Sequence, residues 1–381
     1  MNDARTPPGH LPGEVAPPAS LRRGGRARVL LCRPDHIGDV LLALPAAALL
    51  RTALPDAHLA FAASPATAGL VSRCPYVDDV LALPFPAPNA PAASARWEQV
   101  VDTVAPLLAG HYDVALLLRP DDPWSGALVR RAGVPVRVGF DQPRTAPHLT
   151  DVLRERKDLH VADQGCVLGA AALALLGHDA PPVRSERCLQ LTQEDMAEAA
   201  SGVRVTGAAP IVLHPGSGWA LKNWPAPRWA KLAVALHARH RITSLVLGSP
   251  EDAAVVAAVV DAARGAAVAG AQLSLPGVAA LHARSRLVIT TDSGAAHLAA
   301  MMGAAVVALY GPGDPVSYRP PCPPGRLRVV RVDLDCSPCG TLEHPPCGAV
   351  TNPACITGIS VASVLAAVED LLERVPGPAV T

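Results

Sequence analysis

The sequence has few aromatic residues, only three lysines and no excess of either charge. Aromatic residues make up 3% of the 381 residues, and 33 Lys and Arg balance 33 Asp and Glu. Proteins that coat nucleic acid, or that bind anionic membranes through a polybasic surface, need a clear basic excess, so neither class is favoured. Half of the residues are apolar, which excludes global disorder. With so few aromatic residues, the core has to be built from Ala, Val and Leu.

Long apolar runs and two nucleotide-binding motifs are also missing. The longest apolar runs, such as 40–50 and 255–260, are shorter than the ~20 residues of a membrane-spanning helix. No G-x-G-x-x-G follows the first predicted strand and no G-x-x-x-x-G-K-[ST] occurs, which disfavours an NAD-dependent dehydrogenase or a P-loop NTPase. Residues 1–27 lack the apolar segment of a secretory signal and are expected to form a disordered tail or a short partner-binding arm. We therefore expect a cytoplasmic protein with reduced cysteines.

Strand and helix patterns alternate along most of the chain. In the first half the predicted strands are 27–32, 58–63, 77–83, 112–118 and 136–140, and the predicted helices are 40–52, 65–73, 95–109, 124–132 and 160–176. The pattern breaks over 177–209, apart from a short helix at 194–201. In the second half the predicted strands are 210–213, 242–247, 286–290 and 304–309, and the predicted helices are 227–239, 251–264, a short one around 281–283, 295–302 and 361–374. This alternation predicts doubly wound parallel sheets.

The break in the pattern suggests an α/β protein of two Rossmann-like domains. The predicted parts are a tail at 1–27, an N-terminal domain at 28–190, a linker at 191–209, and a C-terminal domain at 210–381 with a Cys-rich loop at 336–355 and a final helix. Ligands of such folds bind at the carboxyl ends of the strands and often in the cleft between the domains. The loops that follow the strands are therefore the first places to look for chemistry.

Two of these loops combine a glycine with a charged side chain. The loop 37–39 brings Asp39 to the start of a helix, where the carboxylate can act as a general base or simply cap the helix. In the loop 214–225, backbone N–H groups around Ser217 and Gly218 form a plausible phosphate site. Lys222 follows in the same loop, and a compact ammonium suits a diphosphate oxygen. A solvated surface lysine is the alternative.

Two further loops follow the next pair of predicted strands. In the loop 290–297 a buried strand ends and a helix begins, and a helix N-terminus attracts an anion. Asp292 can accept hydrogen bonds from sugar hydroxyls, whereas His297 is as easily a core histidine as a residue that faces a ligand. The turn 311–315 can line the same pocket.

Other charged residues have a weaker pattern. In the loop 248–252, Glu251 or Asp252 can accept hydrogen bonds from ribose hydroxyls or can cap the following helix. Three arginines of the first half can face an anionic acceptor, although a solvated surface is the simpler interpretation: Arg119, Arg130 and Arg131.

Taken in this order and spacing, the motifs resemble those of glycosyltransferase family 9, the ADP-heptose:lipopolysaccharide heptosyltransferases. The resemblance rests on Ile37-Gly38-Asp39-Val40 with Leu44-Pro45, His214-Pro215-Gly216-Ser217 with Lys222 and Trp224-Pro225, and Asp292-Ser293-Gly294 and His297 with Tyr310-Gly311-Pro312-Gly313-Asp314-Pro315. Each motif alone is weak, but together they run from about Arg28 to the last helix. The resemblance implies a GT-B fold, in which two Rossmann-like domains face each other across the site and the N-terminal one binds the acceptor.

The resemblance also implies an activity and a set of site residues. The activity is an inverting transfer of a sugar from a nucleotide diphosphate, usually ADP-heptose, to a hydroxyl acceptor. By position, Asp39 matches the general base, Lys222 the diphosphate contact and Asp292 the contact to the donor sugar. Further donor contacts are implied for Ser217, Gly218, Glu251, Asp252, Ser293, Gly294, Ala295 and His297. Cationic help at the leaving ADP makes a catalytic divalent metal unnecessary.

The acceptor stays open. A lipopolysaccharide core sugar, another glycan, a protein hydroxyl and a small metabolite all fit, whereas nucleic acid does not, and membrane contact is at most peripheral. A nucleotide-sugar epimerase or hydrolase of the same fold is the alternative, and a non-catalytic sugar-nucleotide-binding protein is another. The joint presence of Asp39, Lys222 and Asp292 argues against the last of these.

Four of the nine cysteines lie close together near the C-terminus. They are Cys336, Cys339, Cys347 and Cys355, with the spacing C-x2-C-x7-C-x7-C on a Gly/Pro-rich loop. This spacing fits a tetrahedral thiolate site for a structural Zn²⁺ or a single iron. A similar cysteine finger in some members of the wider heptosyltransferase group favours the metal. Free thiols or a labile disulfide are the alternative.

Overall fold

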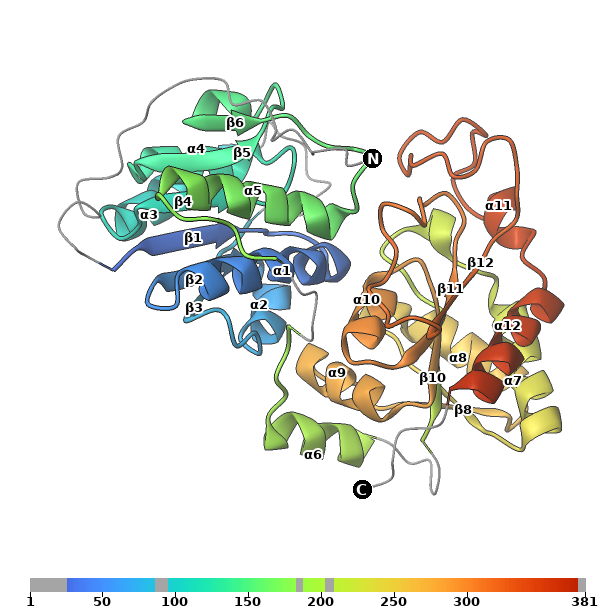
Figure 1. The fold of residues 1–381 in the computed structure, drawn as a ribbon. Helices are drawn as coiled ribbons and strands as arrows, with labels where there is room; N and C mark the ends of the chain where they lie inside the picture. The colour runs from blue at the N-terminus through green and yellow to red at the C-terminus, as the bar shows by residue number, and fades with distance from the viewer. Residues whose placement is uncertain (1–25, 86–94, 183–187, 203–208, 376–381) are drawn as a thin grey trace, which may run out of the picture.

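The computed structural model describes residues 26–85, 95–182, 188–202 and 209–375, and these form two parallel sheets (Figure 1). The first sheet has the strand order β3-β2-β1-β4-β5-β6 and the second has the order β12-β11-β10-β7-β8-β9. The predicted α/β fold of two Rossmann-like halves is confirmed. Nearly all of the predicted tail at 1–27 lies outside the described residues, and the domain boundaries stay a prediction.

The first half and its connection to the second are built from short buried strands and longer helices. The elements are β1 (Arg28–Cys32), α1 (Ile37–Ala53), β2 (His58–Ala63), α2 (Pro65–Val71), β3 (Asp79–Ala82), α3 (Ala95–Leu108), β4 (Val114–Leu117), α4 (Pro123–Arg131), β5 (Val136–Phe140), η2 (Ala146–His148), β6 (Asp151–Leu153), α5 (Val161–Leu175) and α6 (Gln193–Gly202). The central strands are continuous apolar runs because helices cover both faces of a parallel sheet. β6 has only three residues and is partly exposed, and its pattern did not predict a strand.

The second half repeats the same architecture. Its elements are β7 (Ile211–His214), η3 (Ala220–Lys222), α7 (Ala226–His240), β8 (Ser244–Val246), η4 (Pro250–Asp252), α8 (Ala253–Ala262), β9 (Ala267–Ala269), α9 (Leu275–Arg284), β10 (Leu287–Thr291), α10 (Gly294–Met301), β11 (Ala305–Leu309), β12 (Leu327–Val330), α11 (Ala354–Thr357) and α12 (Val361–Arg374). No helix in the described part of the chain is long and apolar enough to cross a membrane.

The cores of both halves consist mainly of Ala, Val and Leu, as the composition predicted. The second half adds two buried tryptophans, Trp224 and Trp229, whose rings meet edge to face with their centroids 5.2 Å apart. The Nε1–H of Trp224 donates a hydrogen bond of 3.0 Å to the carbonyl of Ile359, just before α12. This contact holds the last helix against the start of α7, so the loop that carries Lys222 is anchored on the core.

The two halves meet where α1 points at α10 (Figure 1). A Cβ atom on Gly38 would lie 2.8 Å from the imidazole of His297, and one on Gly294 would lie 2.8 Å from the side chain of Ile37. Glycine is therefore required on both sides, because any larger residue would push the two helix N-termini apart. A second contact joins the halves nearby, where the backbone N–H of Val161 donates to the carbonyl of Ser317 at 3.1 Å.

Candidate active site

A cleft of about 710 Å³ lies between the halves and is lined by loops at the carboxyl ends of their strands. Several predicted site residues line it: Gly38 and Asp39 from the first half, and Ser217, Gly218, Lys222, Asp292, Ser293, Gly294, His297 and Asp314 from the second. Residues that the motifs did not single out also line it, among them Asp35, Phe85, Trp219 and Tyr318. The cleft therefore collects the whole of the loop 37–39 and part of each of the other three predicted loops.

Asp39 stands in the first turn of α1 with its carboxylate one quarter exposed to the cleft. The helix begins at Ile37 rather than at Val40, its N-cap is His36, and no side chain caps it. The interpretation of Asp39 as a helix cap is therefore wrong. One carboxylate oxygen accepts a hydrogen bond of 2.8 Å from the guanidinium of Arg33, which fixes the orientation of the group.

Arg33 is a site residue that the sequence reasoning missed. It follows β1 directly and is 4% exposed. Its guanidinium donates to the carbonyl of Leu118 at 2.5 Å and lies 3.4 Å from the carboxylate of Asp35. Burial opposes its charge, but the carboxylates of Asp39 and Asp35 raise the pKa of Arg33 overall. A charged residue immediately after a buried central strand was the available signal.

The three arginines that the sequence offers for an anionic acceptor lie in different surroundings. Arg119 lines the cleft, and its Nε lies 3.7 Å from the carboxylate of Asp35. Arg130 donates to the carbonyl of Pro147, and Arg131 pairs with Asp102 at the exposed surface. Only Arg119 is therefore positioned to meet a ligand in the cleft.

Lys222 and Asp292 meet each other on the side of the cleft that the second half forms. The ammonium of Lys222 lies 2.8 Å from a carboxylate oxygen of Asp292, and the two side chains are 17% and 7% exposed. The hydroxyl of Ser217 is used within its own loop, 2.7 Å from the carbonyl of Trp219 and 2.8 Å from the side-chain oxygen of Asn223. Any contact of this loop to a phosphate would therefore come from its backbone N–H groups and from Lys222.

The N-terminus of α10 opens into the same cleft. Ser293 is the N-cap residue, and its hydroxyl lies 3.0 Å from that of Thr290 rather than on the helix N–H groups. Gly294, the first helical residue, lines the cleft, whereas Ala295 does not. N–H groups that no cap occupies can hold an anion.

His297 is buried one turn into α10 and still reaches the cleft. Burial lowers the pKa of its imidazole to about 4, although the carboxylates of Asp292 and Asp39 act in the opposite direction. Its Nδ1 has no hydrogen-bond partner among the described residues. The imidazole is therefore neutral near pH 7, and its buried Nδ1 is left without a partner among those residues.

Glu251 and Asp252 do not line the cleft. The carboxylate of Asp252 accepts hydrogen bonds of 2.9 Å from the backbone N–H and the hydroxyl of Ser249, and this forms a capping box at η4. The capping role that was the competing interpretation is confirmed for Asp252. Glu251 is exposed beside it. A ribose contact by either residue stays a prediction.

The four clustered cysteines are free thiols. Cys336 and Cys347 are exposed, Cys339 is partly exposed, and Cys355 is buried in α11. Among the described residues, which include the whole loop, no three His, Cys, Asp or Glu side chains are grouped so that they could hold a metal ion. The expected four-thiolate site is not formed here, because the loop between β12 and α11 has no strand or helix that turns its thiols toward one point.

The cysteine-rich loop nevertheless borders the cleft. Gly340 and Leu342 line it, and the backbone N–H of Gly340 donates to the carbonyl of Pro312 at 2.9 Å. The hydroxyl of Ser337 donates to the carbonyl of Gly311 at 2.8 Å. The loop therefore supports the turn 311–315, which the sequence placed at the same pocket.

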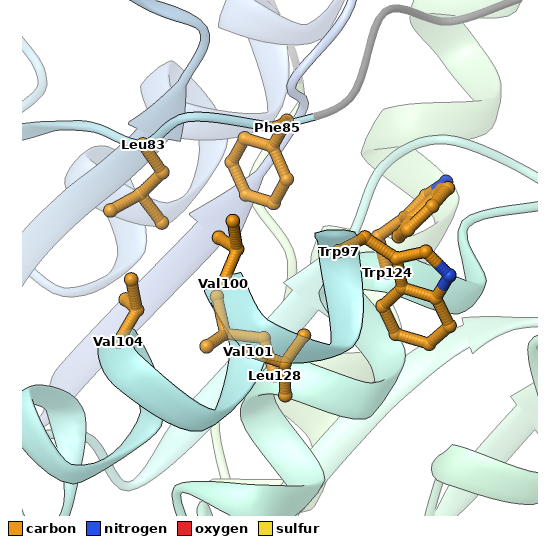
Figure 2. Close-up of a pocket in the computed structure, with 8 residues that line it drawn as sticks. All are labelled: Leu83, Phe85, Trp97, Val100, Val101, Val104, Trp124 and Leu128. Atoms are coloured by element: carbon orange, nitrogen blue, oxygen red, sulfur yellow. The ribbon is translucent and has the colours of Figure 1, made fainter. Parts of the chain in front are cut away.

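A smaller apolar cavity in the first half is not the site. Its volume is about 10 Å³, and Figure 2 shows its lining of aliphatic and aromatic side chains from α3, α4 and the segment after β3. Trp97 and Trp124 meet edge to face there, with their ring centroids 4.2 Å apart. Such a volume holds about one water molecule, and an apolar lining offers it no partner. The cavity is a packing gap beside the cleft.

Comparison with known proteins agrees with this geometry. Residues 103–345 match the family model described as glycosyltransferase family 9 (heptosyltransferase). Lipopolysaccharide heptosyltransferase 1 of Pseudomonas aeruginosa is 26% identical over 330 residues, 82% of this chain and 86% of the relative. Lipopolysaccharide heptosyltransferase 2 of Escherichia coli K12 is 24% identical over 315 residues, 80% of this chain and 88% of the relative.

Solved structures share the whole architecture. The ADP-heptose lipopolysaccharide heptosyltransferase II of E. coli superposes with a TM-score of 0.72 at 19% identity, covering 91% of this chain and 99% of the other. A glycosyl transferase of family 9 from Veillonella parvula DSM 2008 gives 0.71 at 24% identity, covering 91% and 97%. These likenesses establish the GT-B fold. Together with the family match over most of its length, they show that the chain belongs to glycosyltransferase family 9 and is a glycosyltransferase.

Proposed function

We propose that this enzyme transfers heptose from ADP-heptose to a hydroxyl acceptor, with inversion at the anomeric carbon. The names of its relatives support heptose as the sugar, and one structural neighbour is named for ADP-heptose. The observation that carries the proposal is the cleft itself. A carboxylate from one half, Asp39, lines the same space as a cation and a carboxylate from the other half, Lys222 and Asp292.

In the proposed reaction Asp39 is the general base. It takes the proton of the acceptor hydroxyl while that oxygen attacks the anomeric carbon from the face opposite ADP. The new bond joins the acceptor oxygen to the anomeric carbon, and the bond from that carbon to the ADP oxygen breaks with its electron pair going to ADP. Arg33 holds one oxygen of Asp39, and because Asp39 lines the cleft, the other oxygen would accept the proton.

The second half would stabilise the leaving group. Negative charge develops on the diphosphate, and Lys222, the backbone N–H groups at Gly218 and the N-terminus of α10 are suited to meet it. Asp292 would accept hydrogen bonds from the sugar hydroxyls. The neutral imidazole of His297 can donate or accept a hydrogen bond there without adding charge between the two carboxylates.

A thermal-shift experiment tests the donor. The protein is incubated with ADP-heptose, GDP-mannose and UDP-sugars in turn, and the melting temperature is measured. We expect the largest rise with ADP-heptose, since a ligand at 100 times its Kd stabilises the folded state by about 2.7 kcal/mol. A larger rise with a UDP- or GDP-sugar would contradict the proposed donor.

The released products then separate transfer from the alternatives. Heptose transfer requires ADP release that depends on an added acceptor, which we propose to be a glycan, a protein hydroxyl or a small metabolite met in the cytoplasm. A hydrolase would release ADP and free sugar without an acceptor. An epimerase would change the sugar while leaving the nucleotide attached. A binding protein would show the thermal shift and release nothing.

We further propose a structural Zn²⁺ or iron on Cys336, Cys339, Cys347 and Cys355. The spacing of the cysteines supports it, as does their proximity: after burial, the charges of the other three raise the pKa of the Cys355 thiol. Binding would have to draw the thiols together from their present positions, and its free energy would then fold the loop.

Elemental analysis tests the metal. Protein purified without chelator is expected to contain about one Zn or Fe per chain, as one tetrahedral thiolate site holds one ion. Cys339→Ser should lose it while both Rossmann-like halves keep their secondary structure by circular dichroism. Cys322→Ser, outside the cluster, is the matched control and should keep the metal. Protein without metal and with four titratable thiols in this loop would overturn the proposal.

A further inference from the structure

The Lys222–Asp292 ion pair has a consequence for what the cleft binds. In the protein without ligand, the ammonium that is proposed to hold the diphosphate is occupied by the carboxylate that is proposed to hold the sugar. We infer that this pair competes internally with the diphosphate and makes the site select ADP-sugar over ADP. The inference rests on the proposed function and adds a source of specificity to it.

The carboxylate is the fixed member of the pair. Asp292 follows β10 directly, its backbone N–H donates to the carbonyl of Leu309 at 2.9 Å, and it is 5% exposed. Its Oδ2, the atom that meets Lys222, packs so closely on Gly313 that a Cβ there would lie 2.0 Å away. The position of this carboxylate is therefore set by β10 and by the turn after β11.

The lysine is the member that can move. Lys222 lies at the end of the short helix η3, where its backbone N–H donates to the carbonyl of Trp219 at 2.9 Å. The backbone is held, but the four-carbon stem can swing the ammonium. Among the described residues that line the cleft, Lys222 is the only Lys or Arg from the second half, and Arg119 stands across the cleft beside Asp35. Within the described part of the second half, no other lysine or arginine lines the cleft to take over the diphosphate.

ADP and an ADP-sugar differ in whether they provide a new partner for the carboxylate of Asp292. ADP alone draws the ammonium of Lys222 away and leaves the buried carboxylate of Asp292 without its partner, which is unfavourable. An ADP-sugar draws the same ammonium away but brings hydroxyl groups that donate to the carboxylate. The pair therefore weakens the binding of the product ADP more than the binding of the donor, and this difference favours product release after transfer.

Asp292→Asn is the direct test, with Kd values for ADP and ADP-heptose measured by calorimetry. With the ion pair gone, ADP should bind about tenfold tighter, a change of the size typical of the coupling free energy between two binding events on one protein. ADP-heptose should gain less or lose affinity, because the amide accepts poorly from the sugar hydroxyls. The preference for ADP-heptose over ADP should therefore shrink.

Asp314→Asn is the matched control for charge. Asp314 is another carboxylate of the same half that lines the cleft, but it accepts hydrogen bonds from Val316 and Ser317 rather than from Lys222. The Asp314→Asn variant removes one negative charge from the cleft and should lower the Kd for ADP only slightly. In a Lys222→Met background, Asp292→Asn should also have no more effect than this control.

A second variant covers the case in which Asp292→Asn does not fold. Gly313→Ala keeps every charge, but its methyl group displaces the carboxylate of Asp292 from its place against Lys222. It should also tighten ADP and reduce the preference for ADP-heptose. If the wild type binds both ligands and a folded variant leaves the ADP Kd unchanged or higher, the inference about the ion pair is overturned while the proposed function stands. If the wild type binds neither ligand, both the inference and the proposed function are overturned.

Discussion

Replacing Asp39 by Asn is expected to lower turnover by about two to four powers of ten and to leave the affinity for the donor nearly unchanged. The amide can still accept a hydrogen bond from Arg33, so the geometry of the loop is kept, but it cannot take a proton from the acceptor. The measurement is steady-state ADP release with acceptor present, together with a separate donor Kd. A large fall in turnover at constant Kd assigns Asp39 to proton transfer.

Asp35→Asn is the control for the Asp39 prediction. Asp35 lines the same cleft and lies 3.4 Å from the same guanidinium of Arg33, but no proton transfer is assigned to it. Its variant should keep far more turnover than Asp39→Asn. Equal losses in both would mean that the charge around Arg33 matters rather than a base at position 39. Normal turnover in Asp39→Asn would remove Asp39 from the mechanism, and no helix-capping role would replace it.

The sequence predicted most strands of the two sheets, because the central strands are buried on both faces. Such strands are continuous apolar runs between turns, and β2 and β5 lie where the pattern placed them. The strands without a prediction are β6, β9 and β12, which stand at or near sheet edges, are three or four residues long and are partly exposed. An edge strand needs apolar residues on fewer sides, so its pattern does not differ from that of a loop.

The site was predictable where one loop carries both the backbone geometry and the chemical group. Asp39, Lys222 and His297 each follow a glycine-containing turn after a strand, and all three line the cleft. The ion pairs between side chains were not predictable. Lys222 and Asp292 are seventy positions apart in the sequence. Arg33 is only six positions from Asp39, but their contact depends on the path of the arginine side chain rather than on a motif.

For the cysteines, the local spacing strongly predicts a metal site, but the fold does not bring the four thiols together. The spacing from Cys336 to Cys355 is what a metal ligand set needs, but spacing alone does not turn thiols toward one point. A loop without strand or helix relies on turns, and here the hydroxyl of Ser337 and the backbone N–H of Gly340 donate to the neighbouring turn at Gly311 and Pro312. The contact of this loop with the cleft is the feature that the spacing did not indicate.

The second large effect is expected at Lys222. Lys222→Ala should weaken the binding of ADP-heptose and slow transfer together, because the ammonium meets charge that is present in the donor and grows in the transition state. The expected fall in kcat/KM corresponds to roughly 2–4 kcal/mol, the range for loss of one group that stabilises developing charge. Donor Kd by calorimetry and the rate of ADP release are the two measurements.

Two comparisons decide whether that loss is a lost phosphate contact. Lys231→Ala removes an exposed lysine on α7 and should change neither the Kd nor the rate. Lys222→Ala also leaves the buried carboxylate of Asp292 without its partner, and this alone could repel the diphosphate. The double variant Lys222→Ala with Asp292→Asn removes that repulsion. If ADP affinity stays low in the double variant, the ammonium itself binds the diphosphate; if it returns to the wild-type value, Lys222 acts only by neutralising Asp292.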